Sequence, residues 1–136
     1  MARRHRQPGG RGLTSAATVD ESDRVLGQAT VHGTGLAALS TAGVPRVLPH
    51  AGFATTRGTD LNNGVMTVGT RTATVEAPEQ ALLWPSPRTA PVALSTPSDV
   101  LGAVPSTLNE SGTAVGTLAV HTGTGYPASR AVVWSR

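Results

Sequence analysis

The chain has 136 residues, enough for one domain, and its formal charge is +3 at pH 7. The absence of cysteine excludes disulfide bridges and thiolate metal sites. No stretch approaches the roughly 20 apolar residues that a membrane-spanning helix needs, so no membrane association is expected. Lysine and isoleucine are absent, whereas valine and threonine are frequent, which favours β structure built from small side chains.

Residues 1–12 combine arginine with Pro-Gly-Gly and contain no acidic residue, which predicts a disordered basic tail. Its arginines are Arg3, Arg4, Arg6 and Arg11. Without interleaved aromatic residues they indicate only weak, salt-sensitive binding of nucleic acid. Residues 12–19 are too short and too polar for the apolar region of a signal peptide, so no export signal is readable.

One motif occurs three times along the remaining chain. It reads VDESDRVLGQ at residues 19–28, LNNGVMTVGT at residues 61–70 and LNESGTAVGT at residues 108–117. The glycines Gly27, Gly69 and Gly116 are 42 and 47 residues apart. A recurrence of 40–50 residues is typical of repeat architectures.

Short strands are expected after each copy. In the first copy they are residues 25–26, 37–40 and 47–48. The second copy begins with an Asn63-Gly64 hairpin signal, and its strands are residues 65–68, 81–84 and 92–94. Residues 100–104 lead into the third copy, whose strands are residues 113–115 and 130–134.

About four short strands per copy is the content of one propeller blade. The sequence therefore predicts an all-β repeat domain over residues 13–136, with three propeller-like blades of short antiparallel strands at about 13–48, 49–94 and 95–136. Three blades form only an incomplete ring. We expect exposed sheet edges or self-association, with a dimer of six blades as the simplest case. In a closed ring, residues 13–19 could add the outer strand that the third blade lacks.

The copies resemble the HAF repeats of bacterial extracellular-repeat proteins. That family has an Ile-Asn-x-x-Gly-x-Val-Val-Gly strand followed by a His-Ala-Phe-x-Trp strand. Residues 61–69 and 108–116 match its first half, and the alanine and tryptophan of its second half are retained at Ala81/Trp84 and Ala131/Trp134. The resemblance implies a propeller-like, extracellular protein, and it supplies no catalytic residue.

Candidate metal ligands are His32 and His121, each five residues after a motif glycine. The corresponding residue of the second copy is Thr74, and zinc needs three or four ligands, so no metal is expected. The acidic and amide residues around Asp20, Asn62 and Asn109 could suggest a calcium site. Turns closed by their own side chains explain these residues better. The Gly-Thr-Gly segments at 33–35 and 123–125 lack the lysine of a phosphate-binding loop.

No nucleophile motif is present, and the matched positions of the tryptophans favour core packing over sugar stacking. The expected structural residues are Asn62, Gly69, Trp84, Asn109, Gly116 and Trp134. The sequence therefore favours a non-enzymatic β-repeat binding or structural module with no cofactor and an unknown ligand. The alternatives are a fragment of a longer HAF-like propeller protein without independent activity and an enzyme built in a propeller rim.

Overall fold

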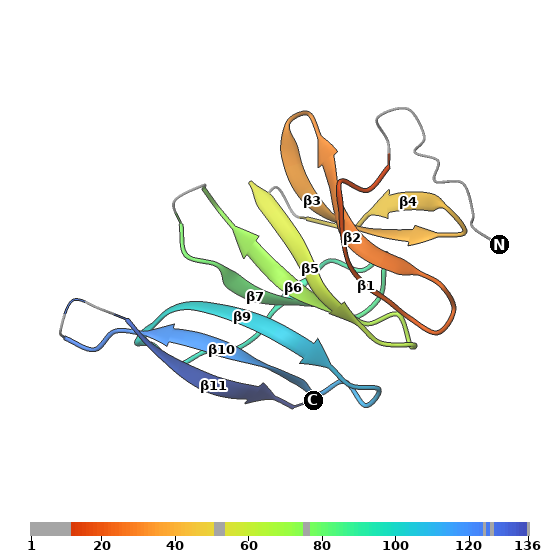
Figure 1. Ribbon diagram of the computed structural model, residues 1–136. Helices are drawn as coiled ribbons and strands as arrows, with labels where there is room; N and C mark the ends of the chain where they lie inside the picture. Colours follow the sequence, from red (N-terminus) through yellow and green to blue (C-terminus); the bar gives the residue numbers. More distant parts are fainter. Residues whose placement is uncertain (1–11, 51–53, 75–76, 124, 126, 136) are drawn as a thin grey trace.

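A computed structural model describes residues 12–50, 54–74, 77–123, 125 and 127–135. They form three antiparallel sheets, called A, B and C, in chain order (Figure 1). Sheet A contains β1 (Ser15–Val19), β2 (Val25–Val31), β3 (Thr34–Thr41) and β4 (Val44–Val47). Sheet B contains β5 (Thr55–Leu61), β6 (Thr67–Thr72), β7 (Gln80–Trp84) and β8 (Val92–Ala93). Sheet C contains β9 (Val100–Leu108), β10 (Ala114–Val120) and β11 (Ala128–Trp134).

The prediction of an all-β chain of short antiparallel strands is confirmed, since the described residues contain no helix. None of the described segments is therefore a helix long and apolar enough to cross a membrane. Each sheet is a meander in which consecutive strands pair, and the described strands do not close into a ring. The predicted basic tail lies outside the described residues except for Gly12.

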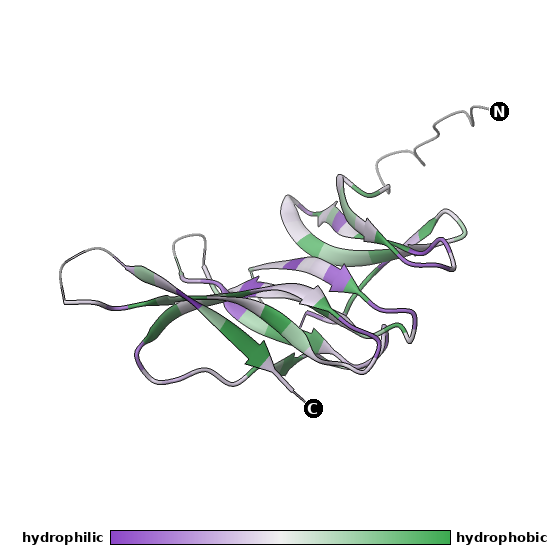
Figure 2. Cartoon of the chain, turned by 60° about the horizontal axis from the view of Figure 1, so that its bottom comes forward, coloured by the Kyte–Doolittle hydropathy of each residue, from purple (hydrophilic) through white to green (hydrophobic). Residues whose placement is uncertain are grey.

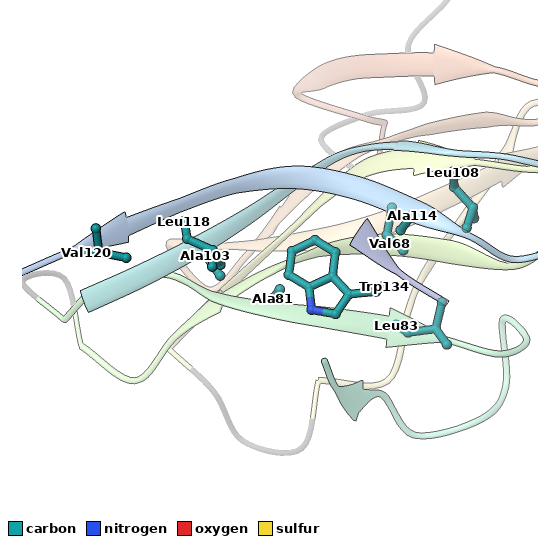
Figure 3. Packing of buried hydrophobic residues seen from close by; sticks show 9 residues of the cluster. All are labelled: Val68, Ala81, Leu83, Ala103, Leu108, Ala114, Leu118, Val120 and Trp134. Carbon is teal, nitrogen blue, oxygen red and sulfur yellow. The ribbon is translucent and has the colours of Figure 1, made fainter. Parts of the chain in front are cut away.

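Sheet B lies between the other two sheets and buries both of its faces (Figure 1). Side chains alternate along a strand, so β7 points Leu82 and Trp84 toward sheet A, and Ala81 and Leu83 toward sheet C. Figure 3 shows the buried apolar cluster between sheets B and C, in which the Trp134 indole lies over β7 near Ala81 and Leu83. The core is thus two thin layers, one in each space between neighbouring sheets.

The N-terminal strand differs from the expectation for a closed ring. Residues of β1 do not join the third sheet but pair with β2, from Ser15 opposite Gln28 to Val19 opposite Val25. The physical reason is loop closure, since a short turn joins β1 to β2 and the entropic cost of pairing them is low. In the described residues sheet C keeps three strands, in the order β11-β10-β9.

The motif glycines are explained by an irregularity in the first strand of each sheet. Beside the motif glycine, the pairing of the first two strands skips one residue in every sheet: Ala17, Thr59 and Ser106. Sheet C has a second irregularity, at Leu101. The bulge pushes a backbone carbonyl against the glycine opposite. A Cβ atom at Gly27, Gly69 or Gly116 would overlap the carbonyl oxygen of Ser15, Arg57 or Val104, respectively. Only glycine leaves room for this approach.

The glycine contact predicts a large loss of stability in Gly69→Ala. Its methyl group would meet the Arg57 carbonyl, and the backbone would have to shift, so the unfolding free energy should fall by roughly 2–3 kcal/mol. Gly64→Ala is the matched control, because the added Cβ would lie 3.4 Å from Asn62 Oδ1 and meet no backbone. Urea denaturation of both variants checks this, and equal losses would contradict the close-approach explanation.

Candidate functional site

The three motif copies form turns with the same hydrogen bonds. In each turn the N–H of the first residue, Asp20, Asn62 or Asn109, donates to the carbonyl four residues later at 3.0 Å. The side-chain Oδ1 of that first residue accepts the N–H of the same later residue, at 2.9, 3.0 and 2.9 Å. One side-chain oxygen thus closes each turn and directs the second strand back beside the first.

The fourth residue of each turn has a left-handed backbone: Asp23 (φ 61°), Val65 (φ 63°) and Gly112 (φ 89°). The expected Asn63-Gly64 hairpin is therefore wrong in its details, because neither residue has positive φ. The side-chain bond of Asn62 closes a longer turn and moves the left-handed position to Val65. A β-branched residue is strained in this region, whereas the third copy has glycine there.

Neighbouring turns are joined by hydrogen bonds into what we call the turn ladder, at residues 20–24, 62–66 and 109–113. The Glu21 N–H donates to Asn63 Oδ1 at 3.0 Å, and the Asn63 N–H donates to the Glu110 carboxylate at 3.0 and 3.1 Å. Two side chains add further bonds, from Arg24 to the Asn63 carbonyl at 2.9 Å and from Asn62 to the Asn109 carbonyl at 3.1 Å. The ladder joins the three stacked sheets at the end where their first strands, β1, β5 and β9, turn into the second strands.

Both tryptophans connect their own sheet to the preceding one. Trp84 Nε1 donates to the Pro49 carbonyl at 2.7 Å, and Trp134 Nε1 donates to the Ser95 carbonyl at 2.8 Å. Pro49 and Ser95 occupy the same place in their units, two residues after the end of the fourth strand. Since both indoles are buried, neither offers a free face on which a sugar could stack.

The carboxylate of Asp20 has a pKa below the usual value of an aspartate. Burial raises its pKa, but hydrogen bonds from the Arg24 backbone, the Arg24 guanidinium and the Ser22 N–H outweigh this and leave the pKa below its usual value. The guanidinium lies 2.6 Å from Oδ2. Both carboxylate oxygens of Asp20 are therefore occupied by protein donors, as expected for a turn closed by its own side chain.

The two candidate histidines are not assembled into a site. His32 lies with Gly33 in the tight turn between β2 and β3, at φ 51°, and its side chain is exposed. His121 follows β10 in sheet C and is also exposed. Within the part of the chain that the structure describes, no three His, Cys, Asp or Glu side chains come together as a metal site.

A groove that the sequence did not indicate lies beside the turn ladder between sheets A and B. Its volume is about 890 Å³. Its basic lining residues are Arg24, Arg46, Arg88 and His50, and no carboxylate is among the residues that line it. Among the residues that the structure describes, the buried Nδ1 of His50 has no hydrogen-bond partner. Arg46 lies on β4, whereas Arg24, His50 and Arg88 lie in separate turns and loops, so no local pattern of sequence brings them together.

Comparisons with known proteins add no assignment: no family model, curated protein or solved structure matches this chain. The interpretation of the site therefore depends on its own geometry, namely the ladder, the indole contacts and the basic groove.

The low pKa of Asp20 predicts an acid-sensitive contribution to stability. The contribution is complete above the unfolded-state pKa of about 3.9 and is lost as the pH falls through the lower folded-state value. Asp20→Asn keeps Oδ1 for the turn, as Asn62 and Asn109 do, but removes the charge. We expect it to lower the unfolding free energy by about 1 kcal/mol at pH 7.

Thermal unfolding of both proteins between pH 2 and pH 7 checks this prediction. The stabilities of the wild type and Asp20→Asn should converge at the acid end, where the wild-type carboxyl is protonated. Glu79→Gln is the control, because the Glu79–Arg57 ion pair is largely exposed and contributes little. A constant difference across the whole pH range would contradict the assignment.

Proposed function

We propose that the chain is a non-enzymatic structural module, in which three propeller-like repeats stack to present a surface to a partner. The observation that supports this most is the recurrence of one joint between neighbouring sheets. The joint between A and B and the joint between B and C each contain a turn-to-turn hydrogen bond and a buried indole bonded to the carbonyl after a fourth strand.

The polar side chains of the motif support a structural role because backbone groups occupy them. Asn62 and Asn109 use Oδ1 to close their turns, and Asp60 accepts the Leu108 N–H across the joint at 2.6 Å. A catalytic carboxylate needs free access to a substrate, whereas these oxygens are used within the protein. The polar side chains of these turns therefore favour a role in assembling the sheets over a role in catalysis.

Four-stranded antiparallel meanders that stack face to face are the components of propellers. The resemblance to HAF repeats agrees with this geometry and adds an extracellular location to the proposal. Under this interpretation Asn62, Gly69, Trp84, Asn109, Gly116 and Trp134 are the residues that define a unit and connect it to its neighbours.

The joint predicts that loss of an indole N–H weakens the whole chain. Trp84→Phe keeps an aromatic ring but leaves the Pro49 carbonyl without its donor, so the unfolding free energy should fall by about 1–3 kcal/mol. Trp134→Phe should lower the unfolding free energy in the same way, because it leaves the Ser95 carbonyl without its donor. Calorimetry should show one cooperative transition at a lower temperature for both variants. Independent transitions of the sheets would contradict a coupled array.

A second candidate function is the binding of an anionic ligand in the basic groove. The favouring observation is that Arg46, on β4, and Arg88, in the loop between β7 and β8, both line a groove that no carboxylate lines. Arg24 also lines it, but its charge is paired with Asp20. The unpaired Nδ1 of His50 adds a polar group that a ligand can satisfy. A sulfated or carboxylated sugar matches this lining.

Binding of a heparin-derived hexasaccharide, measured by isothermal titration calorimetry, tests the groove. The double variant Arg46→Ser/Arg88→Ser should bind at least about tenfold more weakly, since two charge-assisted contacts are lost. The control Arg57→Ser/Arg130→Ser removes the same net charge from positions that do not line the groove. Equal weakening in both double variants would show binding by overall charge and would contradict a site.

A further inference from the structure

We infer that the two outer faces of the array bind each other between copies, so that sheet C of one copy docks on sheet A of a second and two copies form a ring of six sheets. This inference rests on the proposed function and names its partner as a second copy of this chain. We call the face of a sheet on the side of the preceding sheet its leading face, and the face on the side of the next sheet its trailing face. The two outer faces are therefore the leading face of sheet A and the trailing face of sheet C.

The trailing face of sheet C carries the same apolar pair as the two buried trailing faces. In sheets A and B the second and third strands place Leu26 opposite Leu39 and Val68 opposite Leu83, and all four side chains are buried by the next sheet. The equivalent pair in sheet C is Val115 opposite Val133.

These two valines are instead 41% and 62% exposed. Figure 2 shows the hydrophobic end of β11, close to the C-terminus, at the outside of the array. Sheet C thus has an apolar face like the other two but lacks a sheet to cover it. Exposed apolar residues that match a buried pair at equivalent positions mark an interaction surface.

The leading face of sheet A has the complementary residue. Leu61 and Leu108 end the first strands of sheets B and C, and each is buried in a cluster with the trailing-face pair of the preceding sheet. The residue at that position in sheet A is Val19, which is 57% exposed. Val19 of one copy would therefore pack on Val115 and Val133 of the other.

The turn ladder is also incomplete at its two ends in a matching way. Within the described residues, the Glu110 N–H and the Asn109 side-chain amide have no acceptor, and the Glu21 carboxylate has no donor. Inside the chain, the Asn63 N–H donates to the Glu110 carboxylate and Asn62 Nδ2 donates to the Asn109 carbonyl. If the same hydrogen bonds form between copies, the Glu110 N–H of one copy donates to the Glu21 carboxylate of the other. The Asn109 side-chain amide of the first copy then donates to the Asp20 carbonyl of the second.

One residue predicts that the joint between copies is weaker than the internal joints. Sheet A has Ser40 at the position of Trp84 and Trp134, so its leading face contributes no indole. The association should therefore be reversible and depend on protein concentration. A face-to-opposite-face contact forms either a closed ring or an open filament, and six sheets lie within the four to eight blades that propellers close with.

Sedimentation velocity over a hundredfold range of concentration tests the inference with full-length protein. The wild type should shift from one to two chains per particle. Val133→Asp and Val19→Asp should each weaken dimerisation at least about tenfold, because each places a charge in an apolar contact. Val92→Asp is the control, since Val92 is equally exposed on the edge strand β8, away from both outer faces.

Mixing the two variants distinguishes the proposed contact from a symmetric one. Val133→Asp protein keeps an intact sheet A face and Val19→Asp protein keeps an intact sheet C face, so an equimolar mixture should recover a dimer through one joint. Dimerisation that is lost in Val133→Asp but unchanged in Val19→Asp would overturn the inference, because two sheet C faces would then meet.

A wild-type chain that stays monomeric at every concentration would also overturn the inference. If that monomer unfolds in one cooperative transition, the proposed structural module still stands and only the docking of copies is wrong. A wild-type chain without a cooperative transition would overturn the proposed function itself, and the inference with it.

Discussion

A single hydrogen bond, from a backbone N–H to an Asx side-chain oxygen, recurs in all three sheets, and the rest of the structure depends on it. Oδ1 of Asp20, Asn62 and Asn109 closes the turn between the first two strands of its sheet. Because that side chain satisfies one N–H within the turn, other backbone groups of the turn point outward and bond to the neighbouring turn. The spacing of the sheets, and therefore both core layers, follows from this contact.

The stability of the chain is concentrated in the spaces between sheets. Each sheet alone has one or two thin apolar faces of small residues, and a lone meander of this size buries too little to fold. Only sheet B, covered on both faces, buries a tryptophan completely. The marginal stability usual for proteins of this size therefore depends on a few leucines, valines and two indoles at the joints.

Much of this arrangement is readable from the sequence, but only where a residue acts on its near neighbours. The turn residues, the motif strands and the strand carrying Trp84 are local features and can be predicted. The left-handed Val65 cannot, because the Asn63-Gly64 signal favours a shorter turn and the competing bond from Asn62 prevails. The basic groove is also hidden, since Arg46 and Arg88 meet only after sheets A and B have packed.

Both core layers are contacts between sheets that are neighbours in the sequence, and this has an evolutionary consequence. Sheet B carries Leu61 and Trp84 toward the preceding sheet and Val68 and Leu83 toward the following one, so it contains both halves of a joint. An in-frame duplication of this unit would recreate a complete joint without any compensating substitution elsewhere. Duplication or loss of whole units would therefore change the length of the array while leaving each joint intact. Within the described residues, sheets A and C each use only one face in a joint, and their outer faces carry the exposed Val19, Val115 and Val133.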